Sequence, residues 1–222
     1  VPDEMDDVIA AGFPTVYGTS NFALKHRGNL RAGETLLVLG AAGGVGLTAV
    51  ELGKTMGAKV IAAAGGSEKC KVAIDHGADF AIDYKSEDLN SALKKHCPDG
   101  VNIVFDNVGG EFLSESLLYI AEKARIVLCG AISSVGKAQS SISISNYMSL
   151  VIKRAKMEGF ISMDFIQDAP PAIDKIKNWI NEGKLIYRED IVEGLENAPS
   201  TLLRLFSGKN RGKQLLKLAD PE

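Results

Sequence analysis

The stretch LGAAGGVG, residues 39–46, contains glycines at a spacing that could bind a phosphate group. Gly40, Gly43 and Gly46 lie three residues apart, and Gly44 adds a fourth. At a turn from a strand into a helix, bare backbone lets a pyrophosphate reach the N–H groups and the positive end of the helix dipole. The spacing is not the strict G-x-G-x-x-G, and such turns also serve tight packing of a helix on a strand. Dinucleotide binding therefore requires that a strand precedes the glycines and a helix follows them.

The residues about twenty positions further on bear on the choice of nucleotide. Folds that bind NAD usually place an Asp or Glu there, which holds the ribose 2′-hydroxyl. This chain has AAGGS at 63–67, without an acid. Ser67 offers a hydroxyl and a predicted helix N-cap, and Lys69 could bind a 2′-phosphate, although a solvated helix lysine is the alternative. The missing acid and Lys69 together favour NADPH over NADH.

Three other site types fit the sequence less well. A methyltransferase would also need an acid at the end of the second strand, to hold the ribose of its cofactor. A P-loop would need Gly-Lys-Ser/Thr after the glycines. Tyr119 and Lys123 match the YxxxK of short-chain dehydrogenases, but they lie too early in the order of elements. We interpret that match as chance.

Apolar runs with β-branched residues alternate with helical patterns from residue 34 onward. The predicted strands are 35–39, 59–63, 80–82, 101–105, 125–129 and 157–161. Such alternation implies right-handed crossovers and a parallel sheet with helices on both faces. The sequence therefore predicts an α/β fold, a doubly wound parallel (Rossmann) sheet of about six strands.

The helices between these strands are predicted from apolar periodicity and from glycine stops. The first three run from Val45 to Gly57, from an N-cap at Ser67 to Gly77, and over 86–96. A fourth has Leu113, Leu117 and Ile120 on one face, and a fifth runs over 171–183. An amphipathic helix is expected over 191–207. A last strand over 212–218 could extend the sheet or belong to a second domain. We divide the chain into an N-terminal remnant or linker (1–20), a dinucleotide-binding domain (20–185) and a C-terminal segment of a catalytic domain (186–222).

Composition excludes several classes of protein. The 222 residues are 45% hydrophobic and 24% charged with a net charge of −3, which gives no electrostatic reason to expect nucleic acid. No apolar run approaches the roughly 18 residues of a membrane helix. The acidic start lacks both a signal-peptide pattern and an initiator methionine, so we expect a piece of a longer protein.

The cysteines and histidines are scattered along the chain. Cys70, Cys97 and Cys129 form no CxxC pair, and His26, His76 and His96 lie equally far apart. We therefore expect no metal site, and free thiols in a reducing, cytoplasmic setting.

Six short motifs in order carry a family resemblance: AAGGVG, GADFAIDY, FDNVGG, CGAIS, MEGF and GKNRGKQ. With them, residues 10–219 resemble the zinc-independent medium-chain dehydrogenase/reductases, within which they are similar to quinone oxidoreductases and prostaglandin/alkenal reductases. The part up to Tyr84 looks more like the quinone oxidoreductases, and the part from Phe105 more like the alkenal reductases.

The resemblance implies roles for residues of this chain in binding NADPH. Gly43, Gly44, Val45 and Gly46 would hold the pyrophosphate, and Lys69, with Ser67 nearby, the 2′-phosphate. The implied contacts elsewhere along the cofactor are Tyr84 at the adenosine end, Asn107 beside the ribose, Cys129, Gly130, Ala131, Ile132 and Ser133 along the nicotinamide, Phe160 and Ile161 through their backbone, and Asn210 from the tail.

The resemblance also implies a reaction, hydride transfer from NADPH to an α,β-unsaturated aldehyde, ketone or quinone without a metal. Two departures from the family bear on it. In the family a GroES-like barrel precedes this region and supplies much of the substrate pocket, and this sequence does not contain it. Alkenal reductases also carry a tyrosine where this chain has Ser134 to Gly136. Tyr147 is the nearest tyrosine, with helix-face packing as its expected role, and the catalytic residues stay unknown.

We therefore expect a chain that binds NADPH and is weakly active or inactive alone. One alternative is a self-sufficient reductase that completes its site in a homodimer. Another is a non-catalytic NADPH-binding module or an engineered fusion.

Overall fold

Six parallel strands form the centre of the protein in a computed structural model that describes residues 7–136 and 143–219. Their order is β3-β2-β1-β4-β5-β6, and each neighbouring pair is parallel. The strands are β1 (Thr35–Leu39), β2 (Lys59–Ala64), β3 (Phe80–Asp83), β4 (Val101–Asp106), β5 (Ile120–Leu128) and β6 (Lys156–Gly159). This order is that of a doubly wound dinucleotide-binding sheet. The predicted Rossmann fold is confirmed.

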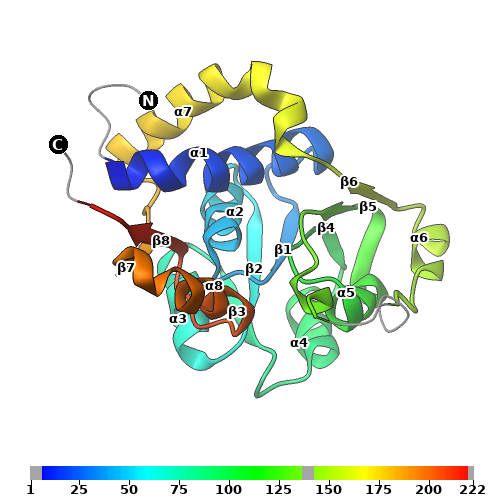
Figure 1. Cartoon of the computed structure of the whole chain (residues 1–222). Coiled ribbons are helices and arrows are strands. Elements are labelled where there is room, and N and C mark those ends of the chain that lie inside the picture. Colours follow the sequence, from blue (N-terminus) through cyan, green and yellow to red (C-terminus); the bar gives the residue numbers. More distant parts are fainter. Residues whose placement is uncertain (1–6, 137–142, 220–222) are drawn as a thin grey trace.

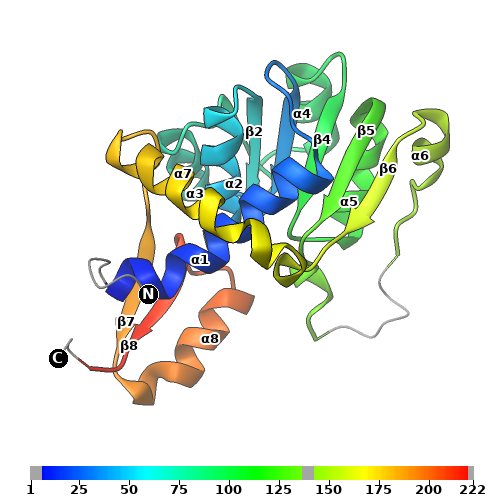
Figure 2. The same cartoon turned by 90° about the horizontal axis from the view of Figure 1, so that it is seen from above.

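Helices cover both faces of this sheet (Figure 2). One face packs against α1 (Asp7–Phe22), α2 (Gly44–Thr55), α3 (Ser67–Asp75) and α7 (Ala169–Asn181). The other face packs against α4 (Leu89–His96), α5 (Gly110–Ser116) and α6 (Met148–Ile152). Shorter helical turns are η1 (Ala23–Arg27), η2 (Leu117–Tyr119), η3 (Ile132–Ser134) and η5 (Ser162–Asp168).

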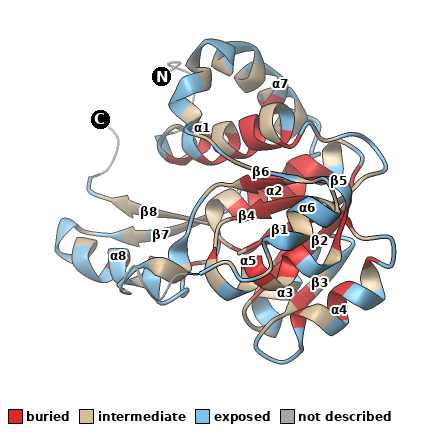
Figure 3. Ribbon diagram, turned by 90° about the vertical axis from the view of Figure 1, so that its right-hand side faces the viewer, coloured by how far each residue is buried: buried red, intermediate tan, exposed pale blue. Residues whose placement is uncertain are grey.

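The side chains of β1 show why both faces must be covered. Leu36 and Val38 enter one core cluster, whereas Leu37 and Leu39 enter the other. Successive side chains of a strand point to opposite faces, so a strand that is apolar throughout is buried on both sides. Figure 3 shows this buried centre in red.

The tail forms a small unit of its own beside the main sheet (Figure 1). β7 (Glu189–Glu193) and β8 (Lys213–Lys217) pair in parallel, joined through η6 (Leu195–Asn197) and α8 (Ala198–Phe206). The predicted helix over 191–207 is therefore wrong in its first turn, where β-branched residues pair with β8. Gly194, at φ +88°, ends β7 in a conformation that other residues adopt at a cost.

The starts of β5 and α4 also differ from the prediction. β5 begins at Ile120, which pairs with Val101 in the sheet and is not on a helix face. α4 begins at Leu89 and not at residue 86, because the Asp88 carboxylate accepts a hydrogen bond from the Ser91 N–H at 2.8 Å and so caps the helix.

A buried carboxylate on α2 joins four segments of the chain. The Tyr17 hydroxyl donates to Glu51 Oε2 at 2.6 Å, and the backbone N–H of Ile186 donates to Oε1 at 2.8 Å. His76 Nδ1, just after α3, lies 2.7 Å from the same Oε1. Burial and the charge of Glu51 raise the pKa of Tyr17, which keeps its proton and its role as donor. Glu51 therefore holds α1, α3 and the start of the tail against α2.

We expect Glu51→Ala to lower the free energy of unfolding by about 3–5 kcal/mol, because removing one member of a buried charged cluster leaves its partners unpaired. Urea denaturation followed by circular dichroism measures this. Glu182→Ala is the control, since Glu182 forms a solvent-exposed ion pair with Lys184 and should leave the midpoint almost unchanged. Equal midpoints for the two variants would contradict the role of Glu51.

Candidate nucleotide-binding site

The site lies at the carboxyl ends of β1 and β4, where the strand order reverses. From β1 the chain crosses over to β2 on one side, whereas β4 lies on the other. Crossovers that leave in opposite directions open a crevice at this edge of the sheet, where nucleotides bind in such folds. The Asn107 side chain, directly after β4, spans the crevice and donates to the Leu39 carbonyl at the end of β1, at 3.0 Å.

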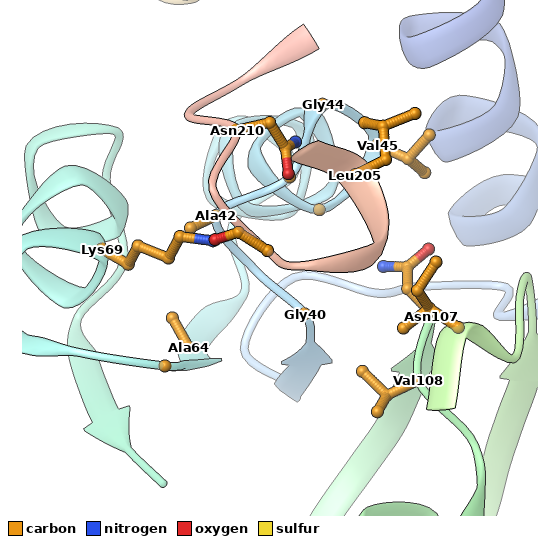
Figure 4. A pocket seen from close by; sticks show the side chains of 15 residues that line it. Gly40, Ala42, Gly44, Val45, Ala64, Lys69, Asn107, Val108, Leu205 and Asn210 are labelled. Atoms are coloured by element: carbon orange, nitrogen blue, oxygen red, sulfur yellow. The ribbon is translucent and has the colours of Figure 1, made fainter. Parts of the chain in front are cut away.

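A cavity of about 300 Å³ occupies this crevice. Its lining combines the turn after β1, the end of β2, α3, the segment after β4, and the tail (Figure 4). The lining residues are Gly40, Ala42, Gly43, Gly44, Val45, Gly46, Ala64, Gly65, Lys69, Asn107, Val108, Ile132, Leu205, Gly208 and Asn210. Eight of the predicted site residues are therefore brought together here: Gly43, Gly44, Val45, Gly46, Lys69, Asn107, Ile132 and Asn210.

The glycines of the turn serve two different purposes. A Cβ on Gly46 would overlap the Gly40 carbonyl oxygen, and a Cβ on Gly44 would lie 3.0 Å from Lys213 Cα of β8. These two glycines permit close packing, the alternative that the sequence left open. Gly43 differs, because a Cβ there would meet only Gly40 O, at 3.8 Å. Packing therefore does not require a glycine at position 43, which lines the cavity and is the N-cap residue of α2.

Lys69 supplies positive charge at one end of the cavity. Its Nζ donates to the Gly208 carbonyl in the tail at 2.6 Å, and Figure 4 shows the side chain extending from α3. Partial burial, followed by the charges of Lys85 and Arg211, lowers the pKa of Lys69. Mutual repulsion of this kind is relieved by an anion.

Ser67 and Tyr84 do not line the cavity. Gly66 is the N-cap residue of α3, and Ser67 is the first helical residue, without a side-chain capping bond. The predicted cap at Ser67 is wrong, because Gly66 adopts the turn conformation, at φ +107°. Tyr84 lies next to Gly65 of the cavity lining, since its hydroxyl would be 2.6 Å from a Cβ on Gly65.

Of residues 129–136 after β5, Ile132 is the one that lines the cavity. Cys129, Gly130, Ala131 and Ser133 flank Ile132 outside the lining. Backbone hydrogen bonds hold this segment to the one after β4, including Ile132 N–H to Asn107 O at 3.2 Å and Ser133 N–H to Val108 O at 3.0 Å.

Phe160, Ile161 and Tyr147 lie outside the cavity lining. Phe160 packs against the same core cluster as Cys129, and Ile161 is 65% exposed. Tyr147 is 58% exposed, so the expected packing on a helix face is wrong. It directly precedes α6, which is only five residues long.

Asp106 shapes the turn that carries Asn107. Its buried Oδ1 accepts hydrogen bonds from the N–H groups of Val108 and Gly109, both at 2.9 Å. Burial nevertheless raises the pKa of Asp106. Burial and the nearby Asp106 carboxylate raise the pKa of Cys129 to about 12. The Cys129 thiol is thus protonated at neutral pH and is not an activated nucleophile.

The tail, which is far from the glycine turn in sequence, completes the site. The Gly212 N–H donates to the Ala42 carbonyl at 3.2 Å, and Asn210 Nδ2 donates to Gly212 O at 3.1 Å. Asn210 was predicted at the site from the family resemblance, whereas Leu205 and Gly208 were not predicted. Val108 could have been predicted at the site, because it belongs to the FDNVGG motif.

Within residues 7–136 and 143–219, no three His, Cys, Asp or Glu side chains are grouped as metal ligands would be. The helices in this part of the chain are too short or too polar to cross a lipid bilayer.

Known proteins are similar to this chain in fold and in sequence. The family described as zinc-binding dehydrogenase matches residues 44–178. A putative NADP-dependent oxidoreductase of Bacillus subtilis, YfmJ, is 41% identical over 211 residues, which are 91% of this chain and 61% of that protein. The tobacco 2-alkenal reductase (NADP(+)-dependent) is 39% identical over 191 residues, 85% of this chain and 55% of the reductase.

A solved structure is similar to this chain as well. CurA from Vibrio vulnificus in complex with NADPH superposes with a TM-score of 0.86 at 37% identity, over 93% of this chain and 63% of CurA. The chain thus spans about three fifths of the length of the proteins it matches. It belongs to the zinc-binding dehydrogenase family and, within it, to the quinone oxidoreductase and prostaglandin/alkenal reductase type.

Proposed function

We propose that this chain binds NADPH and forms the cofactor half of a reductase for α,β-unsaturated aldehydes, ketones or quinones. The observation that carries the proposal is the cavity in which the glycine turn and Lys69 meet, with Ala64 and Gly65 where an NAD site would place an acid. The relatives support it, since the tobacco protein is named an NADP-dependent alkenal reductase and CurA was solved with NADPH.

The residues of the cavity fit the parts of this cofactor. Among the described residues no side chain caps the N-terminus of α2, and the first N–H groups of a helix have no partner within it. These N–H groups, presented at Gly43, would bind the pyrophosphate. Lys69 would bind the 2′-phosphate, and Asn107, Val108 and Ile132 would enclose the part of the ligand that lies over β4.

Bound NADPH supplies the hydride, and the chain's residues hold and shield it. The apolar side chains of Val45, Val108, Ile132 and Leu205 limit the access of water from the cavity walls. We assign no catalytic residue to this chain. The substrate pocket would come from the region of the relatives that this chain does not match. The three free cysteines support a reducing, cytoplasmic location.

A self-sufficient reductase that completes its site in a homodimer is the second candidate. Exposed apolar side chains on α8, namely Leu202, Leu203 and Phe206, favour it as a surface for self-association. A module that binds NADPH without catalysis is the third candidate, and the turnover measurement below separates it from the second.

Lys69→Ala should weaken NADPH binding roughly tenfold or more and leave NADH almost unchanged, because a charge-assisted hydrogen bond to the 2′-phosphate is worth about 1.5–3 kcal/mol. Titration of cofactor fluorescence measures both affinities. Lys71→Ala is the matched control, since this lysine of the same helix pairs with Asp75 in solvent. An equal loss for NADH and NADPH would refute the assignment of Lys69.

The purified chain should oxidise NADPH slowly or not at all with a short alkenal or a quinone, because an open site cannot position substrate against the cofactor. Absorbance at the NADPH band measures turnover, with a full-length alkenal reductase as the reference. Turnover near that of the reference, growing with protein concentration, would favour the self-sufficient dimer. Failure to bind NADPH would refute all three candidates.

A further inference from the structure

The loop over residues 207–212, between α8 and β8, is fastened to the first turn of α3 by two charged side chains. Lys69 Nζ donates to the Gly208 carbonyl at 2.6 Å. One residue earlier on α3, the Glu68 carboxylate pairs with the guanidinium of Arg211. Two neighbouring residues of one helix thus hold the two ends of one loop, about 140 residues away along the chain.

Three cations lie near one another where this loop meets α3. Partial burial lowers the pKa of Lys69, and the charges of Lys85 and Arg211 lower it further. Glu68 forms an ion pair with Arg211, and both side chains are largely in solvent, 74% and 51% exposed respectively. Exposed ion pairs contribute little stability, so a stronger anion can replace this carboxylate at small cost.

A phosphate monoester is such an anion. It carries more charge than a carboxylate near neutral pH, and its oxygens accept two parallel hydrogen bonds from a guanidinium. Lys69 has three N–H donors, of which the Gly208 carbonyl uses one. A phosphate can therefore bind Lys69 without releasing the loop.

We propose that Arg211 is a second residue that recognises the 2′-phosphate of NADPH, and that it exchanges Glu68 for the phosphate when the nucleotide binds. The inference rests on the proposed function, because it places the 2′-phosphate at Lys69. The exchange makes Glu68 a competitor of the ligand. It also ties the 207–212 loop to the bound nucleotide through both Lys69 and Arg211.

The backbone around Arg211 lets its side chain move while the loop stays in place. The Arg211 N–H donates to Asp190 Oδ2 at 3.1 Å, and the same carboxylate oxygen pairs with Arg204 at 2.6 Å. The next residue, Gly212, is hydrogen bonded to the glycine turn. The guanidinium can thus change partners by side-chain rotation alone.

Calorimetric titration with 2′,5′-ADP and with 5′-AMP tests the proposal, since the two ligands differ only in the 2′-phosphate. Arg211→Ala should weaken 2′,5′-ADP roughly tenfold and leave 5′-AMP unchanged. Arg211→Lys should recover part of that loss, because lysine keeps the charge without the paired donors. Lys71→Ala, which removes a lysine on α3 that pairs with Asp75, should change neither affinity.

The exchange itself is tested by Glu68→Gln. In the otherwise unchanged protein this variant should tighten 2′,5′-ADP binding several-fold, because Arg211 no longer has a competing partner. Combined with Arg211→Ala, it should have almost no effect. An equal gain in both backgrounds would show that Glu68 acts only through its general field and would overturn the exchange.

The remaining outcomes separate this inference from the proposed function. If the unchanged chain binds 2′,5′-ADP more tightly than 5′-AMP but Arg211→Ala binds both as the unchanged chain does, Arg211 is not a phosphate residue and the inference alone fails. If the unchanged chain binds the two nucleotides equally or binds neither, NADPH recognition fails, and the inference fails with it. Thermal melting of each variant, expected to match the unchanged chain, confirms that the affinities are those of folded protein.

Discussion

A parallel sheet must be buried on both faces, and this constraint decides where the protein can bind a ligand. Its central strands β1, β2 and β4 are largely apolar and buried, so helices cover each side and no sheet face is left for a site. The ends of the strands remain accessible to a ligand. In this chain the crossovers leave β1 and β4 in opposite directions, and the crevice between the ends of these two strands contains the cavity. The position of the site is thus a consequence of burial before any site residue is considered.

The glycine turn has to satisfy packing and binding within a few residues. Gly46 is required because the backbone of the turn itself lies where its side chain would be, and a Cβ on Gly44 would lie only 3.0 Å from the backbone of β8. Gly43 has no such neighbour and lines the cavity. The question whether such glycines indicate a ligand or a tight fold therefore has a separate answer for each position. Substitution at Gly43 tests binding, whereas substitution at Gly46 tests folding.

The strands and the glycine turn could be predicted from the sequence because their signals are local. Five of the six strands were predicted within one or two residues, and β5 alone starts earlier, at Ile120. The helix α1 was not predicted, because Pro14 lies within it and proline usually ends a helix. The first turn of the predicted tail helix was wrong because Ile191 and Val192 gain a strand partner in β8, more than twenty residues further on.

The least predictable part of the site is the side formed by the tail. Gly208 meets Lys69, and Gly212 meets Ala42, across more than a hundred residues of sequence. No local pattern reports such a contact. The resemblance pointed to Asn210, but not to the hydrogen bond that places it against Gly212.

This late contribution has a consequence for biosynthesis. A ribosome makes the chain from its N-terminus, so the six strands emerge before the 207–212 loop that completes the cavity. A nascent chain that ends after α7 has the glycine turn and Lys69, but it lacks the residues that close over them. Full affinity for the nucleotide therefore requires that the 207–212 loop has been made. Stabilisation by that ligand can protect only chains that include this loop from proteolysis, so chains that stop before it stay open to degradation.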